Sequence, residues 1–496
     1  MTQAKTNLDK IKHIVVLMQE NRSFDQMFGY LYHEQGNVSP TGQAFEGLTG
    51  QESNPLSQEG GSEEIGVFPI EKSNPYSYVM PKADPGEGYS DTISQLYGHP
   101  ANHDGPSNQG FVNNFAYTLK NVDSKWTPKS GIPPIYPDAE PKDIMGMFTP
   151  ELLPVMSGLA KGYAVCDHWY CAIPTETVPN RTFIACGTSQ GVLKDTNPKT
   201  GKPYMYSANT IYNVLSDHKR SWKIYGYDSY PLTPGGLEAL HQFQNGKQDN
   251  NYFGEFSDFQ NDVKTGQLAD YVFLEPKFGP KGNSMHPNYN VANGEQFIYE
   301  TYTTLKNSAL WEDTLLIITF DEHGGNYDHI LPPTAVQPNA DAVNKTYDFD
   351  FTQFGIRVPT ILISPYIEAG SVFRAPENGP PLSHSSVLAT LEAKYKLPPL
   401  TERDKHAPNI SAALSLEKPR QDDPLANVVP PQYTPPEPQP DHVGHLQKVN
   451  ADYCSYRYCR KKYGDDYDKW EWPEFSTSDE ADEHIRDKYR EFSKRD

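Results

Sequence analysis

The sequence predicts an α/β fold in which helices cover both faces of a mostly parallel sheet. Three short runs are continuously apolar and end in polar residues: His13–Leu17, Leu315–Phe320 and Val358–Ser364. Such runs are typical of strands that are buried on both faces of a parallel sheet. Between them lie helical stretches, and Asn293–Leu310 has apolar residues at helical spacing with little Gly or Pro. Buried strands alternating with helices indicate a sheet packed on both sides.

Length and charge narrow the class of protein. The 496 residues allow up to three domains at about 150 residues each, although one large α/β domain fits equally well. The formal net charge is -21, which repels phosphate backbones and anionic lipid surfaces. We therefore expect no nucleic acid among the partners. The oligomeric state is left open by the sequence.

The compartment is only partly constrained. No stretch of 18 or more apolar residues exists, so we expect no transmembrane segment. The apolar run His13–Met18 is too short for a signal-peptide core, so the chain is either cytoplasmic or an exported protein without its leader. Five cysteines are too few for a disulfide scaffold, and Cys454 and Cys459 either pair or stay reduced.

The chain divides near residue 416. Eight of the 22 residues from Pro419 to Pro440 are proline, which indicates an extended connector. Beyond it, Ser478–Arg495 resembles a charged helix. We therefore predict a catalytic domain over residues 1–416, followed by a proline-rich connector and a charged C-terminal extension over residues 417–496.

Acidic and amide side chains follow two of the predicted strands. Glu20 and Asn21 come after the first strand, and Asp321 and Glu322 come after the second. Ligands in open α/β sheets lie outside the carboxyl ends of the strands. These side chains are oxygen donors, which favours Ca²⁺ or Mg²⁺ and leaves Mn²⁺ or Zn²⁺ possible. The alternative is a helix cap with solvated acids. A turn at Gly324-Gly325 is able to bring both later acids to one ion.

Three further residues lie next to predicted helices. Pro179 suits a first helical position, which places Thr177 at or just before a helix N-terminus, where an anion is stabilised. The alternative is that Thr177 is an ordinary N-cap. His286 and His384 lie in loops before helices, and each alone is best read as a satisfied loop residue. The two histidines become candidates for catalysis only if the fold brings them close to Thr177.

Five strings carry a resemblance to a known family: MQENRSFDQMFG, TVPNRTF, MHP…NGEQFI, LLIITFDEHGGNYDHILPP and GIRVPTILISPYIEAGSV. Together they resemble the phosphoesterase family of bacterial and plant phospholipases C and acid phosphatases. They occur in that family's order and span roughly residues 12–400. The resemblance implies the alkaline-phosphatase superfamily and its fold, a three-layer α/β/α sandwich.

The resemblance also implies roles for particular residues. It implies Thr177 as the nucleophile, with Thr175 as a much weaker competitor. Asn180 is then expected to bind a phosphate oxygen, and His286 to lie beside the leaving group. His384 resembles a histidine that many superfamily members bring to the site from late in the chain. The implied metal ligands are Glu20, Asn21, Thr177, Asp321 and Glu322.

Two positions depart from the family pattern. Many relatives have Asp-Pro-x-His where this chain has Asp84-Pro85-Gly86-Glu87, so Glu87 either fills that place at the substrate or the role is absent. Relatives also often have a second histidine where this chain has Tyr289. The loss of a proton donor weakens the case for a strict acid-phosphatase profile.

The resemblance implies metal-dependent hydrolysis of phosphoric esters through a phosphothreonine intermediate. The favoured form is phospholipase C-type cleavage of phospholipids, and the alternative is a broad-specificity phosphomonoesterase. A non-catalytic metal- or phosphate-binding protein is more remote, since no implied site residue is missing. Sulfate-ester hydrolysis is disfavoured because the site lacks the motif that sulfatases modify. The aromatic stretches Trp169-Tyr170 and Trp222–Tyr230 either form an apolar rim or cage, or simply pack under loops.

Overall fold

A large central sheet organises the molecule in this computed structural model, which describes residues 7–58, 61–98, 105–122, 127, 131–246, 250–340 and 342–493. In the described part, eight strands lie in the order β13-β6-β12-β11-β1-β10-β8-β9. Their bounds are β1 His13–Gln19, β6 Ala164–Val165, β8 Trp222–Gly226, β9 Phe253–Glu255, β10 Tyr271–Glu275, β11 Thr314–Phe320, β12 Ile361–Ile363 and β13 Ser371–Val372.

The sheet is mostly parallel, as expected, with one reversed strand. β1 pairs in parallel with β10 and β11, in register from Ile14 opposite Tyr271 and Leu315. β12 runs antiparallel to both of its neighbours, β11 and β6. The prediction of a parallel strand over Val358–Ser364 was therefore wrong in direction and too long. Burial on both faces produces an apolar run whichever way a strand points, so the pattern holds no information on direction.

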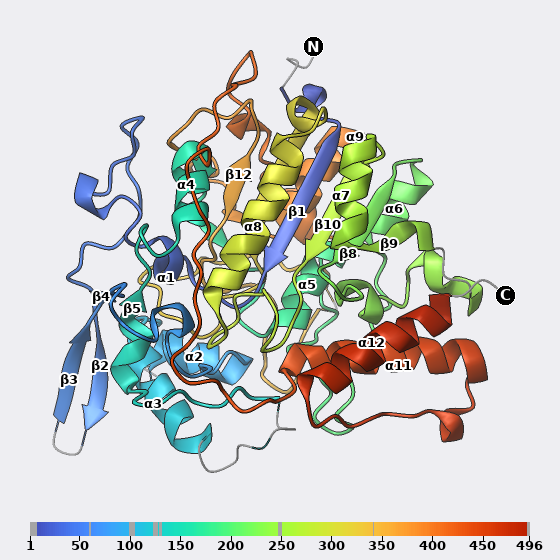
Figure 1. The fold of residues 1–496 in the computed structure, drawn as a ribbon, viewed down its shortest axis with the longest axis horizontal. Helices are drawn as coiled ribbons and strands as arrows, with labels where there is room; N and C mark the ends of the chain where they lie inside the picture. The colour runs from blue at the N-terminus through green and yellow to red at the C-terminus, as the bar shows by residue number, and fades with distance from the viewer. Residues whose placement is uncertain are drawn as a thin grey trace.

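Helices cover both faces of this sheet, which confirms the three-layer expectation (Figure 1). One layer contains α4, α7 and α8, and the other contains α5, α6 and α9. The predicted helix over Asn293–Leu310 is α8, which begins earlier, after the Asn290 cap, and ends at Lys306. The bounds are α4 Pro154–Gly162, α5 Thr177–Cys186, α6 Ile211–Asp217, α7 Phe256–Thr265, α8 Val291–Lys306 and α9 Ser385–Tyr395.

A smaller unit, formed by residues 36–147 and called the insertion below, lies at the carboxyl end of the sheet. It has its own apolar cluster, formed by residues such as Leu96, Phe111 and Met147. Its elements are β2 Ser53–Gln58, β3 Gly61–Gly66, β4 Phe68–Pro69, α2 Tyr89–Tyr97, α3 Phe111–Val122 and β5 Gly146–Met147. The short α1 Phe24–Phe28 follows β1 and belongs to the main core. The remaining short elements are β7 Trp169–Tyr170, β14 Leu382–Ser383, α10 Glu402–His406 and the 3-10 helices 7–10, 33–35, 77–79, 141–145, 233–236, 241–246, 250–252, 311–313, 411–413 and 467–469.

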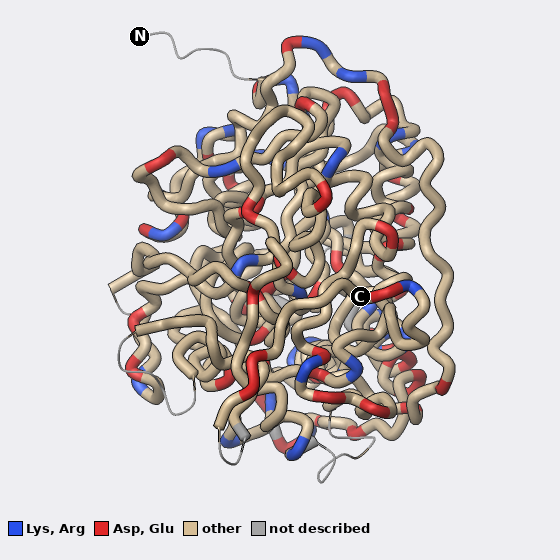
Figure 2. Tube along the Cα trace, turned by 90° about the vertical axis from the view of Figure 1, so that its left-hand side faces the viewer, with Lys and Arg blue, Asp and Glu red and all other residues tan. Residues whose placement is uncertain are grey.

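The C-terminal extension packs on the rest of the chain. The proline-rich connector runs along the surface, down the front of Figure 1 and the right-hand edge of Figure 2, to α11 His445–Tyr463 and α12 Ser478–Ser493. Leu446, Val449 and Tyr453 of α11 belong to the same apolar core as the sheet. The predicted helix Ser478–Arg495 is α12, although its last two residues lie outside the described part. The domain boundary at residue 416 stays a prediction.

The cysteines and aromatic stretches are mainly structural. All five cysteines are free and buried, Cys454 and Cys459 included. Trp169, Trp222 and Tyr230 are almost fully buried, and they belong to the apolar core. The packing interpretation of these aromatic residues is therefore confirmed, and they form no exposed rim.

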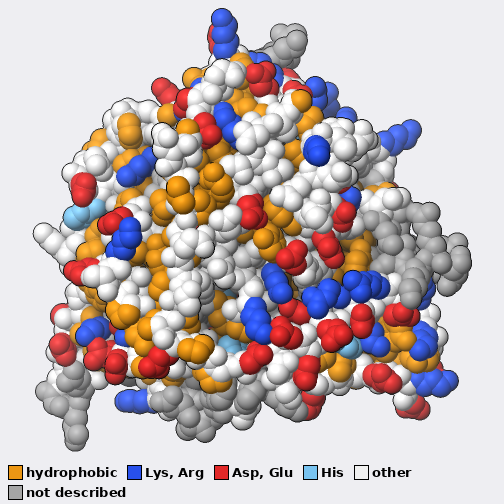
Figure 3. Space-filling view, in the orientation of Figure 1, with side chains coloured by type: hydrophobic (Ala, Val, Ile, Leu, Met, Phe, Trp, Pro, Cys, Tyr) orange, Lys and Arg blue, Asp and Glu red, His pale blue; other side chains and the backbone are white. Residues whose placement is uncertain are grey.

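Charged side chains of both signs share the face of the molecule that Figure 3 draws. Figure 3 shows Lys and Arg side chains interspersed with Asp and Glu over the region of α11 and α12, so this face has no large patch of one sign. Among the described residues, no helix is long and apolar enough to cross a membrane.

Candidate active site

Asn21 lies at the carboxyl end of β1, where it links three parts of the chain. Its backbone has a left-handed φ of 56°, which is unusual for a residue other than glycine. Its amide N–H donates to Oδ1 of Asp321 over 2.9 Å. Its side-chain Nδ2 donates to Oε2 of Glu87. A strained backbone at the end of a central strand is a common feature of functional sites.

The turn after β11 holds the two later acids against Asn21. Gly324 and Gly325 both have positive φ, 60° and 68°. A Cβ at Gly324 would lie 2.2 Å from the carbonyl oxygen of Asn21, so the turn passes directly over that residue. The N–H of Gly324 donates to Oε2 of Glu322 over 2.7 Å. The turn that the sequence indicated at these glycines therefore brings Asp321 and Glu322 beside Asn21.

Helix α5 presents Thr177 at its first position. The helix begins at Thr177 with Glu176 as its N-cap, so Pro179 is its third residue and not its first. Proline fits there because the first-turn N–H groups have no partners within the helix. Thr177 is not an ordinary N-cap. It is only 1% exposed, and its hydroxyl donates to Oδ1 of Asn21 over 3.0 Å.

A buried arginine holds the cluster together electrostatically. Nε of Arg181 donates to Oδ2 of Asp321, and Nη1 donates to Oε1 of Glu275, each over 3.0 Å. Its Nη2 donates to the main-chain oxygens of Met18 and Gln19 at the end of β1. All three charged side chains are buried. Arg181 thus ties α5 to the ends of β1, β10 and β11.

Two carboxylates of the cluster each have one oxygen without a partner. Oε2 of Glu20 and Oε1 of Glu322 are buried and accept no hydrogen bond from the described residues. Burial, followed by the charge of Asp321, raises the pKa of Glu20 to about 8. The same two causes raise the pKa of Glu322 well above its ordinary value. Unpaired buried carboxylate oxygens are an unfavourable arrangement that a divalent cation relieves, so the residues present fit such an ion.

A second group of titratable side chains lies beside Asn21. Asp84, Glu87 and His286 each offer a ligand atom, and these atoms all lie within 4.8 Å of one another. Nε2 of His286 is 3.8 Å from Oδ1 of Asp84 and 3.8 Å from Oε2 of Glu87. Burial lowers the pKa of His286 to about 3. The structure therefore brings the predicted residues Glu87 and His286 to the same place as Asn21.

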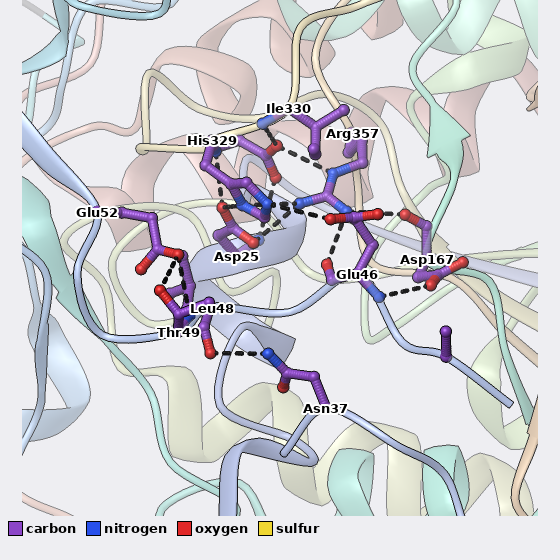
Figure 4. A network of polar contacts seen from close by, with 12 residues as sticks. Asp25, Asn37, Glu46, Leu48, Thr49, Glu52, Asp167, His329, Ile330 and Arg357 are labelled. Carbon is purple, nitrogen blue, oxygen red and sulfur yellow. Dashed lines mark hydrogen bonds and ion pairs between the residues drawn. The ribbon is translucent and has the colours of Figure 1, made fainter. Parts of the chain in front are cut away.

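A third group, Asp25 with Asp328 and His329, also meets the spacing for a metal. Figure 4 shows that the guanidinium of Arg357 lies within this group. Arg357 donates to Oδ1 of Asp25 and to Oδ1 of Asp328, each over 2.9 Å. A buried cation already neutralises these acids, so the group is a structural ion-pair network.

His384 and Asn180 are engaged elsewhere in this structure. Nε2 of His384 is 2.6 Å from the main-chain oxygen of Asp321, and Nδ1 accepts from the indole of Trp169. Nδ2 of Asn180 donates to the main-chain oxygens of Thr175 and other residues in the loop before α5. Their assignments to the reaction and to the substrate stay predictions. In this structure both residues position the backbone of the site.

Several residues at the site were missed by sequence reasoning. Asp195 accepts from the N–H of Val178 over 2.8 Å, and its other oxygen is 3.0 Å from Nε2 of His445. Neither residue lies in a motif, and 250 positions separate them in the chain. Arg181 lies inside the string TVPNRTF, and its place in that string was the one feature of the sequence that pointed to the site.

The fold and the site define a class of protein. A hydroxyl at a helix N-terminus faces a cluster of buried carboxylates at the carboxyl ends of a mostly parallel sheet. That arrangement is typical of hydrolases that attack a charged ester with a covalent nucleophile.

Comparison with known proteins places the chain within this class. The family model described as "Phosphoesterase family" matches residues 11–398, so the chain belongs to the phosphoesterase family of phosphoric ester hydrolases. It is 32% identical to non-specific phospholipase C4 of Arabidopsis thaliana, over 84% of this chain and 73% of that one. It is 33% identical to non-specific phospholipase C5 of the same plant, over 84% of this chain and 77% of that one. It is 28% identical to phospholipase C A of Mycobacterium tuberculosis (strain ATCC 25618 / H37Rv), over 79% of this chain and 74% of that one.

Likeness to solved structures is more remote. A Vibrio parahaemolyticus protein of the alkaline phosphatase superfamily aligns with a TM-score of 0.30 and 14% identity, over 53% of this chain and 65% of that one. The phosphonate monoester hydrolase of Agrobacterium radiobacter aligns with a TM-score of 0.29 and 12% identity, over 53% and 72%. Neither likeness is close enough to support an argument about the reaction.

Proposed function

We propose that this protein hydrolyses the phosphodiester bond of phospholipids in the manner of a phospholipase C, with Thr177 as its nucleophile. The observation that carries the proposal is the position of Thr177. Thr177 is the first residue of α5, and its hydroxyl donates to Asn21, next to the unpartnered oxygens of Glu20 and Glu322. The relatives that share about a third of its residues are named phospholipases C, which supports the diester as substrate.

The proposed reaction has two steps. The Thr177 hydroxyl loses its proton to solvent, its oxygen attacks phosphorus, and the bond from phosphorus to the lipid alcohol breaks. Glu87, whose pKa burial raises well above its ordinary value, gives its proton to the leaving alcohol, while His286, whose pKa burial lowers to about 3, stays neutral beside it. Water then gives a proton back to Glu87 and attacks phosphorus, which breaks the bond to Thr177 and releases the phosphorylated head group. The unpaired N–H groups and the dipole at the start of α5 stabilise the charge on the phosphoryl oxygens.

We assign the metal to the predicted ligands Glu20, Asn21, Asp321 and Glu322, together with Thr177. A divalent cation held there supplies positive charge that lowers the pKa of the Thr177 hydroxyl and offsets the charge of the phosphate. The all-oxygen set favours Ca²⁺ or Mg²⁺. We expect Glu20→Gln to purify with less metal than the wild type by elemental analysis. Stoichiometric metal in that variant would remove Glu20 from the ligands.

The proposal is tested with two aryl substrates. We expect the protein to hydrolyse p-nitrophenyl phosphorylcholine faster than p-nitrophenyl phosphate, and Thr177→Ala to lose about 10⁴-fold or more of either rate. Thr175→Ala, which changes a threonine two residues away, serves as the matched control. A preference for the monoester would instead indicate a phosphomonoesterase. Wild-type rates in purified Thr177→Ala would overturn the assignment of the nucleophile.

A further inference from the structure

The C-terminal extension reaches the active site through its first helix. His445 is the first residue of α11, and its Nε2 is 3.0 Å from Oδ2 of Asp195. The other oxygen of Asp195 accepts from the N–H of Val178, the residue that follows Thr177. The N–H of Asp195 in turn donates to Glu176, the N-cap of α5. One buried carboxylate thus fixes His445 to the N-terminus of the helix that presents the nucleophile.

The imidazole of His445 lies between this helix end and solvent. Its side chain is 38% exposed, whereas that of Asp195 is fully buried. Its Nδ1 makes no hydrogen bond with the described residues. Its charge acts on Asp84 and on His286, and the charges of Asp84 and Glu176 act on it, so these side chains lie close enough to influence one another. Partial burial lowers the pKa of His445, but the hydrogen bond and charge of Asp195 outweigh it and raise the pKa to about 9.

A second contact joins the same segment to the site. The hydroxyl of Tyr289 is 3.2 Å from Nε2 of His442, three residues before His445. The extension therefore brings two histidines, His442 and His445, to this side of the site.

The charges of the site explain what His445 does. Asp84, Glu87 and Glu176 lie in this region, and burial raises the pKa of each, so none of them offers a positive charge to a phosphate anion. The buried guanidinium of Arg181 is already paired with Asp321 and Glu275. His445 is a partly exposed cation with a free ring nitrogen. A charge-assisted hydrogen bond from such a group to a phosphate oxygen is worth more than one between neutral groups.

We propose that His445, brought in by the C-terminal extension, is a substrate-binding residue that donates a hydrogen bond from Nδ1 to a non-bridging oxygen of the bound phosphoester. The proposal rests on the proposed function and names a further residue of that site. The proposal also gives the C-terminal extension a role in substrate binding, because residues 1–416 alone do not contain His445. Asp195 acts as the positioning residue that holds the ring and keeps it charged.

The test compares two substitutions of His445 in the full-length protein. His445→Gln keeps a hydrogen-bond donor near Asp195 without the charge, and His445→Lys keeps the charge. We expect His445→Gln to lower kcat/KM for p-nitrophenyl phosphorylcholine by about tenfold or more, and to weaken inhibition by inorganic phosphate to a similar extent. We expect His445→Lys to retain more of the wild-type kcat/KM and more of the inhibition by phosphate than His445→Gln does. A residue with a purely structural role would not be replaced better by lysine than by glutamine.

A matched control lies in the same extension. His484 of α12 is within hydrogen-bond distance of Ser455 of α11, 2.7 Å away, and makes no contact with the site. We expect His484→Gln to leave both measured constants unchanged. Equal losses in His445→Gln and His484→Gln, accompanied by a lower Tm in both, would show that His445 acts through the fold and would overturn the proposal.

Phosphate binding separates this proposal from the proposed function. Titration calorimetry with inorganic phosphate measures affinity without turnover. If the wild type hydrolyses neither aryl ester, the proposed function fails, while a tenfold loss of phosphate affinity in His445→Gln still supports the contact. Equal phosphate affinity in wild type and His445→Gln overturns the contact even if the wild type is an active phosphodiesterase.

Discussion

At the scale of single residues, the guanidinium of Arg181 offsets the cost of burying two carboxylates beside each other. Its two ion pairs neutralise Asp321 and Glu275, and both acids are fully buried. Removing one partner of a buried ion pair leaves an uncompensated charge, which costs about 3–5 kcal/mol. We expect Arg181→Met to lower the free energy of unfolding by this amount in a urea titration.

The control for this prediction is Arg181→Lys. Lysine keeps the positive charge but lacks the planar fork that contacts both acids and the end of β1. Its loss of stability should be smaller than that of Arg181→Met. If the methionine variant were as stable as the wild type, the buried pairs would not be what holds these acids in place.

The sequence indicated which side chains would meet at the ends of the strands. Asn21, Asp321 and Glu322 lie within two residues of the ends of β1 and β11, and the ends of parallel strands meet at one edge of a sheet. Their meeting therefore follows from local patterns. The contact of Asp195 with His445 spans 250 positions and depends on how an extension packs. No local pattern predicts such a contact, and the resemblance did not cover that part of the chain.

At the scale of elements, the turn after β11 sets the geometry of the site. Gly324 has a left-handed backbone, and a Cβ there would lie 2.2 Å from the carbonyl oxygen of Asn21. We expect Gly324→Ala to lose at least about 2 kcal/mol of stability and most of its activity, because Asn21 must shift. Urea unfolding and hydrolysis of the aryl diester measure the two effects.

Gly266 provides the matched control for this substitution. It has a φ of +73° at the end of α7, and nothing lies within 4 Å of a Cβ built there. Gly266→Ala therefore pays the backbone strain alone, about 1–2 kcal/mol, and should keep its activity. Full activity in Gly324→Ala would contradict the role given to the turn.

Elements were predicted where burial is continuous or periodic. The runs that became β1 and β11, and the helix that became α8, showed their type directly in the sequence. The start of α5 was misplaced by two residues because proline tolerates more than one position in a first turn. The reversal of β12 had no signal, because a strand buried on both faces has the same composition in either direction.

At the scale of the whole molecule, the network in Figure 4 joins the insertion to the catalytic fold. Burial lowers the pKa of His329, but the charge and hydrogen bond of Asp25 outweigh it and raise the pKa to about 9. A pKa raised on folding stabilises the protein fully below the unfolded value of 6.5. That stability is lost as the pH rises through 9. The upper limit of this contribution is about 3 kcal/mol.

We therefore expect His329→Gln to be less stable than the wild type at pH 6, and nearly as stable at pH 10. Urea titrations of both proteins at the two pH values measure this difference. A gap in stability that is the same at both values would mean that the charge of His329 contributes nothing.

The C-terminal extension is an integrated part of the folded molecule. The sequence marked it as an appendage, because proline-rich composition indicates a connector and says nothing of what the connector delivers. In the structure, α11 shares the main core and links His445 through Asp195 to the N-terminus of α5. The candidate site therefore combines the strand ends with residues of the insertion and of the extension.

The most direct test of the central claim is to trap the covalent enzyme. Wild-type protein is mixed with p-nitrophenyl phosphorylcholine, quenched in acid during the first turnover and digested for mass spectrometry. We predict phosphorylcholine on Thr177, with no adduct in Thr177→Ala and almost no release of p-nitrophenol by that variant. A burst of p-nitrophenol from an enzyme whose Thr177 is unmodified, or an adduct on Thr175, would contradict the claim.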